Sequence, residues 1–221
     1  MKAFIVLAAA LLLPQEKNEA EELFRKMEAK LVAAKTIQMK VKGLLNEGKV
    51  QVTVDLQVAE ENRARLAAEM KILDQTVTSG SVSDGKNIQR TSTEGIRLPL
   101  QPTPEKFGQL VRRCIAAYGC VTAGYAFSEG SKADPAVAYK VTEFVLGPKE
   151  KIGKTETQMV QYKLATKDES GITVMVWIDP KTNLPVKRRL TSEHKAVEET
   201  YSELKFDEKI DPAKFELSKD K

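Results

Sequence analysis

The sequence contains few of the residues that carry catalytic or metal chemistry, with one histidine and two cysteines among 221 residues. The histidine, His194, lies in a polar stretch between two expected strands, so we interpret it as an exposed turn residue. One histidine and two cysteines do not readily assemble a common zinc site. The chain also lacks a Gly-x-Ser-x-Gly element, and residues 124–130 lack the Lys-Ser/Thr of a phosphate-binding loop. We therefore expect no enzyme, no metal site and no cofactor.

Charge of one sign is not concentrated anywhere along the chain. The 35 basic and 31 acidic residues are mixed and give a formal net charge of +4. Without a basic block, nucleic acid is not an expected partner. Adjacent acidic pairs, such as Glu60-Glu61 and Glu198-Glu199, point to opposite faces of a strand, and we interpret them as solvent-facing charge. With 30% charged and 42% hydrophobic residues, the chain is expected to be globular.

The longest apolar run, residues 3–13, is too short to cross a hydrocarbon core of about 30 Å as a helix. Because it follows the positive start Met1-Lys2, it has the layout of a secretory signal. We expect a signal peptide over residues 1–15, with cleavage between 14 and 20, and a periplasmic location. Residues 16–221 are then long enough for a single domain. The alternative is an uncleaved membrane anchor.

An exported chain would expose its two cysteines to an oxidising compartment. On a continuous helix, the Cα atoms of Cys114 and Cys120 would lie about 9 Å apart along the axis, beyond disulfide reach. Gly119 could end that helix and let Cys120 fold back. The sequence leaves two alternatives open, a disulfide or two buried thiols.

Two segments have the three-and-four spacing of apolar residues that is typical of amphipathic helices. The first covers residues 16–35 and the second residues 105–119. Their apolar faces consist of Ala20, Leu23, Phe24, Met27 and Leu31 in the first, and of Phe107, Leu110, Val111, Cys114, Ile115 and Tyr118 in the second.

Most of the remaining chain alternates apolar and polar residues, which predicts about ten half-buried strands. These strands cover residues 37–42, 49–58, 65–72, 76–82, 87–93, 136–145, 157–166, 172–178, 184–190 and 197–206, before a short closing segment at 210–217. Turn signals lie at residues 46–48, 83–86 and 179–183, and three prolines mark a loop at 99–104. A sheet of this size curls and needs cover on its apolar face. We predict an α+β fold, a curved antiparallel sheet wrapped around helices.

Three segments carry a resemblance to a known family. Residues 178–185 resemble an Ile-Asp-Pro-x-Thr-Gly-Leu-Pro hairpin, with Asn183 in place of the glycine. Residues 210–217 resemble a closing Ile-Asp-Pro-x-x-Phe-x-Phe segment, with Leu217 in the last aromatic place. Residues 83–86 match a Ser-Asp-Gly-Lys turn. Taken in order over nearly the whole chain, they resemble the LolA-like outer-membrane lipoprotein-carrier family, with its LolA, LolB and RseB-like fold.

The resemblance implies an incomplete β-barrel with two or more helices on its concave side. It also implies a periplasmic carrier or binding protein for lipid or acylated lipoprotein, which acts as a monomer and meets donor and acceptor proteins of the envelope. The alternative is an envelope sensor or interaction module on the same fold. One departure concerns the Arg-Pro pair that follows the second long strand in carriers, where the Arg latches the helical lid. Glu60 occupies that position here, with Arg63 and Arg65 as nearby alternatives.

A lipid site on this fold would be an apolar trough between the sheet and the second helix. Each CH₂ group removed from water contributes about 0.8 kcal/mol, so such a trough binds acyl chains without polar contacts. Methionines would add a lining that adapts to different chains. The alternative is that the same residues form a filled core. The expected trough residues are Met39, Val41, Val52, Val54, Leu56, Leu66, Met70, Phe107, Leu110, Val111, Ile115, Val174 and Val176.

Overall fold

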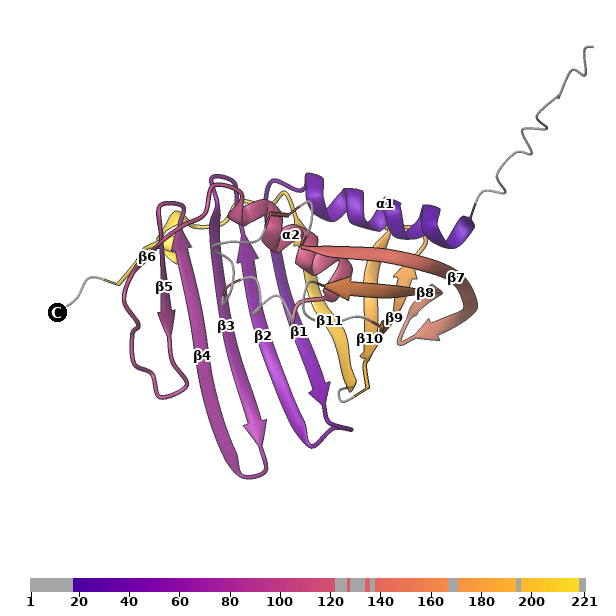
Figure 1. The fold of residues 1–221 in the computed structure, drawn as a ribbon, viewed down its shortest axis with the longest axis horizontal. Helices are drawn as coiled ribbons and strands as arrows, with labels where there is room; N and C mark the ends of the chain where they lie inside the picture. The colour runs from indigo at the N-terminus through magenta and orange to yellow at the C-terminus, as the bar shows by residue number, and fades with distance from the viewer. Residues whose placement is uncertain are drawn as a thin grey trace, which may run out of the picture.

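An open antiparallel sheet of eleven strands dominates the computed structural model (Figure 1). The structure describes residues 18–121, 127, 134–135, 138–166, 171–193 and 196–218. The strand order is β6-β5-β4-β3-β2-β1-β11-β10-β9-β8-β7, which places β6 and β7 at the two edges. The last long strand, β11, pairs with the first, β1, and so joins the two halves of the chain into one sheet. The predicted curved antiparallel sheet with two helices is confirmed.

The helices and strands follow one another in the order expected from the sequence. Their bounds are α1 (Glu19–Ala33), β1 (Ile37–Leu45), β2 (Val50–Val58), β3 (Arg63–Ile72), β4 (Gln75–Asp84), β5 (Asn87–Thr91), β6 (Gln101–Pro102), α2 (Phe107–Tyr118), β7 (Tyr139–Ile152), β8 (Thr155–Thr166), β9 (Ile172–Asp179), β10 (Leu184–Thr191), β11 (Ala196–Phe206) and the 3₁₀ helix η1 (Pro212–Phe215).

The α1 helix begins at Glu19 because the Asn18 side chain caps it, accepting hydrogen bonds from the backbone N–H groups of Ala20 and Glu21. Its apolar face is buried against the sheet. The Phe24 ring lies 4.7 Å from the Tyr162 ring and 5.2 Å from the Phe144 ring, measured between centroids. These contacts place α1 over the β7–β8 end of the sheet.

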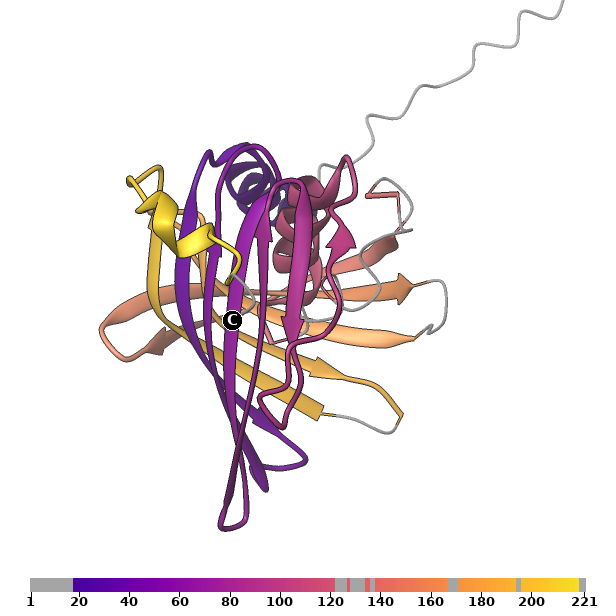
Figure 2. The same cartoon turned by 90° about the vertical axis from the view of Figure 1, so that its left-hand side faces the viewer.

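The two faces of the sheet differ as the alternating sequence predicts. In β2, Val52, Val54 and Leu56 are buried, whereas Gln51 and Thr53 are exposed. Figure 2 shows α2 on one side of strands β1–β4 and η1 on the other. The buried apolar side chains of both helices and of the sheet form one cluster, so the core lies between the helices and the concave face.

Three elements differ from the sequence prediction. β6 is a two-residue strand inside the expected proline loop. β7 continues past Gly147 and Pro148 to Ile152, where we expected an end at Val145. Register shifts between Thr142 and Val145 and between Leu146 and Lys149 accommodate this, because bulges on an edge strand tolerate Gly and Pro. The closing segment is η1, capped by the Asp211 side chain.

The described residues exclude parts of the chain on which some predictions fall. The predicted signal peptide and His194 lie outside them, as does the start of the predicted strand at residues 136–145. Within the described ranges, no helix has the length and apolar character to cross a membrane. Nor do those ranges contain three or more His, Cys, Asp or Glu side chains grouped to hold a metal ion.

Candidate lipid-binding site

The fold brings all the predicted trough residues into one cluster on the concave face. All are buried except Met70, which is half-buried at the end of β3. They come from β1, β2, β3 and β9 in the sheet and from α2 above it. The structure thus gathers residues more than 130 positions apart in the chain, from Met39 to Val176, into a single apolar layer.

Cross-strand register shows how continuous this layer is. Met39 of β1 lies opposite Leu56 of β2, which lies opposite Leu66 of β3. The next row toward the hairpin tips runs from Val41 through Val54. Because partners in an antiparallel pair point to the same face, these rows form an uninterrupted apolar surface under α2.

The N-terminal end of α2 is held by a residue from outside the helix. Lys106, at the N-cap position, makes no side-chain capping bond. Asn62, in the turn between β2 and β3, accepts a hydrogen bond from the Gly108 N–H at 2.9 Å and donates one to the Glu105 carbonyl at 2.7 Å. Asn62 therefore satisfies one of the N–H groups that a helix start leaves unpaired, and ties α2 to the sheet.

The C-terminal end of α2 is held by side chains of the sheet. The fully buried Arg188 of β10 donates to the carbonyls of Ile115 and Ala116 at 2.7 and 2.8 Å. The Tyr162 hydroxyl of β8 donates to the Ala117 carbonyl at 2.6 Å. These are carbonyls of the last helical turn, which carries partial negative charge and favours a nearby cation.

A buried carboxylate completes this contact. Glu199 of β11 accepts hydrogen bonds from the backbone N–H groups of Cys120 and Val121, at 3.1 and 2.5 Å, and from the Tyr201 hydroxyl at 2.6 Å. Glu199 lies opposite Arg188 in the β10–β11 register. We call Tyr162, Arg188, Glu199 and Tyr201 the α2 clamp, because together they bind the end of the helix to the concave face.

Gly119 is required where the clamp meets the helix. Its φ is +97°, a conformation that side chains rarely adopt. A Cβ atom there would overlap the Glu199 carboxylate and lie 2.9 Å from Arg188 Nη1. The predicted helix end at Gly119 is therefore confirmed, and the missing side chain is what lets the clamp close.

A further arginine joins the two helices. Arg112 of α2 donates to the carbonyls of Ala34 and Lys35, at 3.0 and 2.9 Å, just after the end of α1. It also donates to the Gly108 carbonyl in its own helix at 3.1 Å. Burial lowers the pKa of Arg112, with Glu60 and Asp207 acting in the opposite direction. Both helices thus end on arginine contacts.

Burial controls the ionisation of the clamp. It raises the pKa of Glu199, while Arg188 and the three donated hydrogen bonds oppose the rise. Burial also raises the pKa of Tyr162 to about 12 and that of Tyr201 well above its ordinary value. Both phenols therefore stay neutral at ordinary pH and act as hydrogen-bond donors.

Cys114 and Cys120 are free thiols in the structure, and both are buried. Of the two alternatives that the sequence leaves open, the structure has the buried thiols. Burial raises the pKa of Cys114 to about 12 and that of Cys120 well above its ordinary value. Protonated, enclosed thiols pack as small hydrophobic groups.

The sequence interpretation of Glu199 as solvent-facing charge is wrong, since its exposure is 0%. Its neighbour Glu198 does face outward and pairs with Lys187 at 2.9 Å. The strand pattern does indicate this burial. Side chains two residues apart in a strand point to the same face, and Glu199 lies two residues after the apolar Val197, as Arg188 lies two residues before Leu190. Two opposite charges at inward positions of consecutive strands indicate a buried pair.

Arg63 and Arg65, the two nearby alternatives to the arginine of the resembled family, lie on the outer face of the sheet. Arg63 lies over the Phe215 ring, 5.7 Å from its centroid, beside η1. Arg65 pairs in register with Gln57 and Val82, the outward row of β2–β4. The arginine that contacts the carbonyls of α2 is instead Arg188 on β10, which the family resemblance does not indicate.

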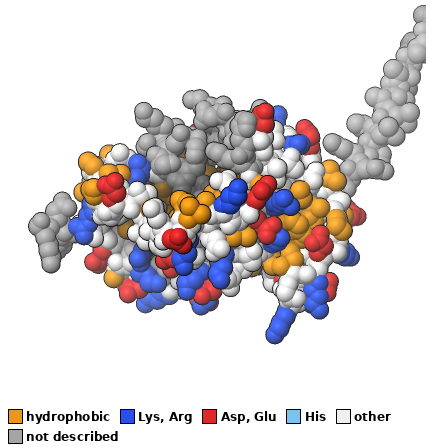
Figure 3. Space-filling view, turned by 90° about the horizontal axis from the view of Figure 1, so that it is seen from below, with side chains coloured by type: hydrophobic (Ala, Val, Ile, Leu, Met, Phe, Trp, Pro, Cys, Tyr) orange, Lys and Arg blue, Asp and Glu red, His pale blue; other side chains and the backbone are white. Residues whose placement is uncertain are grey.

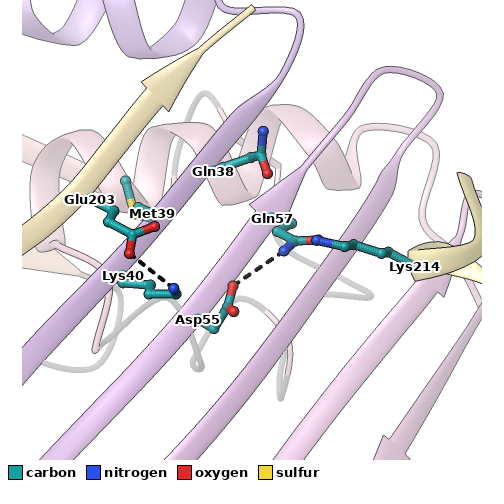
Figure 4. A pocket seen from close by; sticks show the side chains of 7 residues that line it. All are labelled: Gln38, Met39, Lys40, Asp55, Gln57, Glu203 and Lys214. Atoms are coloured by element: carbon teal, nitrogen blue, oxygen red, sulfur yellow. Dashed lines mark hydrogen bonds and ion pairs between the residues drawn. The ribbon is translucent and has the colours of Figure 1, made fainter. Parts of the chain in front are cut away.

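A small hollow of about 140 Å³ lies on the outer face beside η1 (Figure 4). In it Lys40 pairs with Glu203 at 2.9 Å, and the Gln57 amide donates to Asp55 at 3.4 Å. Lys214 reaches in from η1. Such a polar lining suits water rather than an acyl chain. The residues predicted for the apolar trough are on the concave side instead.

Seen from the end of the sheet where the β1–β2 and β3–β4 hairpins turn, hydrophobic side chains appear between charged ones (Figure 3). Exposed residues at these turns include Leu44, Ile72 and Leu73, with exposed fractions of 41%, 39% and 90%. Apolar surface therefore reaches solvent at the end of the sheet away from α1.

Neither a protein-family model nor a curated protein sequence matches this chain. Among solved structures, LprF from Mycobacterium bovis matches with a TM-score of 0.53 at 11% identity, over 85% of this chain and 93% of that one. At this identity the likeness concerns the fold alone. The fold is LolA-like.

Two further structures show weaker likeness. Lipoprotein LppX from Mycobacterium tuberculosis has 12% identity and a TM-score of 0.47, over 86% of this chain and 98% of that one. A LolA superfamily protein from Nitrosomonas europaea has 9% identity and a TM-score of 0.36, over 90% and 97%.

Proposed function

We propose that this protein binds lipids or acylated lipoproteins outside the cytoplasm and carries them, holding acyl chains between the concave face of the sheet and α2. On this proposal it is a binding protein rather than an enzyme, and residues 1–15 direct export of a single domain, residues 16–221. Donor and acceptor proteins of the envelope are its expected partners, and it acts as a monomer.

The observation that carries the proposal is the form of the contact between α2 and the sheet. The middle of the helix contributes Leu110 and Val111, which are buried in the same cluster as the apolar rows of β1–β3. The polar contacts to the strands and their turns are at the two ends, at Asn62 and at the α2 clamp, while Arg112 in the middle bonds to the link between α1 and β1. A helix bound at its ends over an apolar layer is arranged to release that layer at one end and to keep its place at the other.

The two ends are unequal. Asn62 supplies two hydrogen bonds from an exposed turn, whereas Arg188 and Glu199 of the clamp are fully buried. Hydrogen bonds near solvent exchange with water at small cost, while exposing a buried charged pair is expensive. We infer that the N-terminal end of α2 opens and that the clamp is the hinge.

A lipid-uptake measurement on two variants tests the proposal. Asn62→Ala removes a cap worth about 1 kcal/mol and should speed uptake of a fluorescent phospholipid from vesicles severalfold, without loss of capacity. Met70→Glu places a charge in the half-buried end of the trough and should abolish uptake. Lys71→Glu, at the next residue on the opposite face, is the control and should leave uptake unchanged. Failure of the folded wild type to take up any lipid would overturn the proposal.

The alternative function is an envelope sensor or interaction module without transport. The observation that favours it is the near-complete burial of the trough residues, since Leu56, Val111 and Ile115 are 0% exposed. If these residues are a filled core, a partner would have to bind on the outer face of the sheet. Native mass spectrometry of protein purified from an envelope fraction, with organic extraction in parallel, separates the two. A co-purifying acylated species supports the carrier, and a clean apo mass with no uptake of added phospholipid supports the sensor.

A further inference from the structure

One cross-strand row of the concave face changes character as it approaches the β6 edge. It begins with Met39, Leu56 and Leu66, continues to Ser81 of β4, and ends at Arg90 of β5. Register places all five side chains on the same face of the sheet. The apolar layer under α2 is therefore continuous with a hydroxyl and then a cation, over about 19 Å for four strand spacings.

The three serine hydroxyls of β4 on the concave face differ in whether they already have a hydrogen-bond partner. The Ser83 hydroxyl already has partners, because it donates to the Asn62 carbonyl at 2.8 Å and lies 3.0 Å from the Thr103 hydroxyl. Ser79 and Ser81 also belong to the concave face, opposite Ala68 and Leu66. Within the described residues neither of these hydroxyls has a hydrogen-bond partner, so both can still bind a ligand.

Arg90 is the cation of this region. Its Nε atom is buried and lacks a hydrogen-bond partner, while the side chain as a whole is half-exposed. Among the described carboxylates, none forms an ion pair with it. A buried donor without a partner is unfavourable, so an incoming acceptor at this position removes an existing penalty.

We propose that Arg90, with Ser81 and Ser79, binds the oxyanion headgroup of the lipid whose acyl chains occupy the trough. The inference rests on the proposed function and narrows its ligand to an amphiphile with a phosphate or a carboxylate. Guanidinium groups recognise both through paired hydrogen bonds, and the serine hydroxyls supply additional donors. A neutral diacyl lipid would fill the same trough and leave Arg90 unpaired.

The orientation of the ligand follows from the row. The headgroup lies over β4 and β5, near the β6 edge, and the chains extend across β3, β2 and β1 beneath α2. The buried Ile88, two residues before Arg90 on the same strand face, marks where the apolar layer ends on β5.

Binding of four probes to the full mature chain tests the inference: phosphatidylglycerol, a fatty acid, a diacylglycerol with the same chains, and inorganic phosphate. We expect the wild type to prefer phosphatidylglycerol over diacylglycerol by about tenfold, the worth of one hydrogen bond to a charged group. Arg90→Gln should remove this preference and leave diacylglycerol binding unchanged. Arg65→Gln, an arginine of the outward row in the same sheet, is the matched control and should keep the preference.

The outcomes separate the headgroup inference from the proposed function. Equal binding of phosphatidylglycerol and diacylglycerol by the wild type overturns the headgroup site and leaves lipid binding intact. No binding of either overturns the proposed function as well. A preference for fatty acid that Arg90→Gln removes supports the site with a carboxylate ligand. Inorganic phosphate that binds as tightly as the phospholipid overturns the claim that the site serves a lipid. A melting curve for each variant shows that it is folded.

Discussion

Arg188 is the residue whose loss should most damage the arrangement of helix and sheet. In Arg188→Met the carbonyls of Ile115 and Ala116 lose donors at 2.7 and 2.8 Å, and Glu199 keeps a buried carboxylate without its neighbouring cation. Removing one of two opposite charges that are buried in the same site costs about 3–5 kcal/mol in unfolding free energy. For a chain of this length, that corresponds to a fall in Tm of roughly 6–20 °C.

Urea unfolding measures this loss directly. Trp177, the single tryptophan, is 8% exposed in β9 beside β10, so its fluorescence should change when the sheet opens. Arg189→Met, one residue later and exposed, is the control and should change stability by less than about 0.5 kcal/mol. Replacing both Arg188 and Glu199 by Met should cost less than the sum of the single changes, because the pair is coupled. A loss below 1 kcal/mol for Arg188→Met would refute the assignment of the clamp.

Three other predictions follow from the same contacts. Gly119→Ala should destabilise the protein by more than about 1 kcal/mol in urea unfolding, whereas Gly48→Ala, which has a positive φ but open space, should cost about 1 kcal/mol or less. Stability should be complete below pH 9 and fall as the pH rises toward 12, because the unfolded chain releases the protons of Cys114 and Tyr162 first. Urea midpoints across that range check this, and a flat profile would contradict it. Iodoacetamide should modify neither Cys114 nor Cys120 in the folded protein and both after unfolding without reductant; thiols that stay unreactive after unfolding would indicate a disulfide.

The sequence predicts the fold well where local pattern and tertiary burial agree. The strict alternation of residues 49–58 has one register in which every valine faces the core, and the structure adopts it. Asn183, which takes the place of a glycine in the resembled hairpin, has a φ of +54°, a conformation that asparagine tolerates. The sequence predicts a strand end at Val145, before the Gly147-Pro148 pair that normally ends a strand, whereas pairing with β8 through two bulges carries β7 to Ile152.

The site was predictable in its apolar part and not in its polar part. Val52, Leu56 and Val111 are inward by periodicity alone, so the layer under α2 could be listed from the sequence. The contacts at the ends of α2 join residues 43 to 79 positions apart, such as Asn62 with Glu105 and Glu199 with Cys120. Strand alternation places Arg188 and Glu199 on the inward face, but no local pattern encodes which residues of α2 they contact. A charged residue is usually expected on the surface, but it can be buried when a residue of opposite charge lies opposite it, as Arg188 does for Glu199.

The central claim is that acyl chains occupy the layer between α2 and the concave face. Photo-crosslinking with a phospholipid that carries a diazirine on its acyl chain, followed by peptide mapping, tests it most directly. The account predicts labelling at inward residues of β1–β3, including Met39 and Met70, and little at outward neighbours such as Lys40 and Lys71. Labelling confined to outward residues, or none in a protein shown to be folded, would contradict the account.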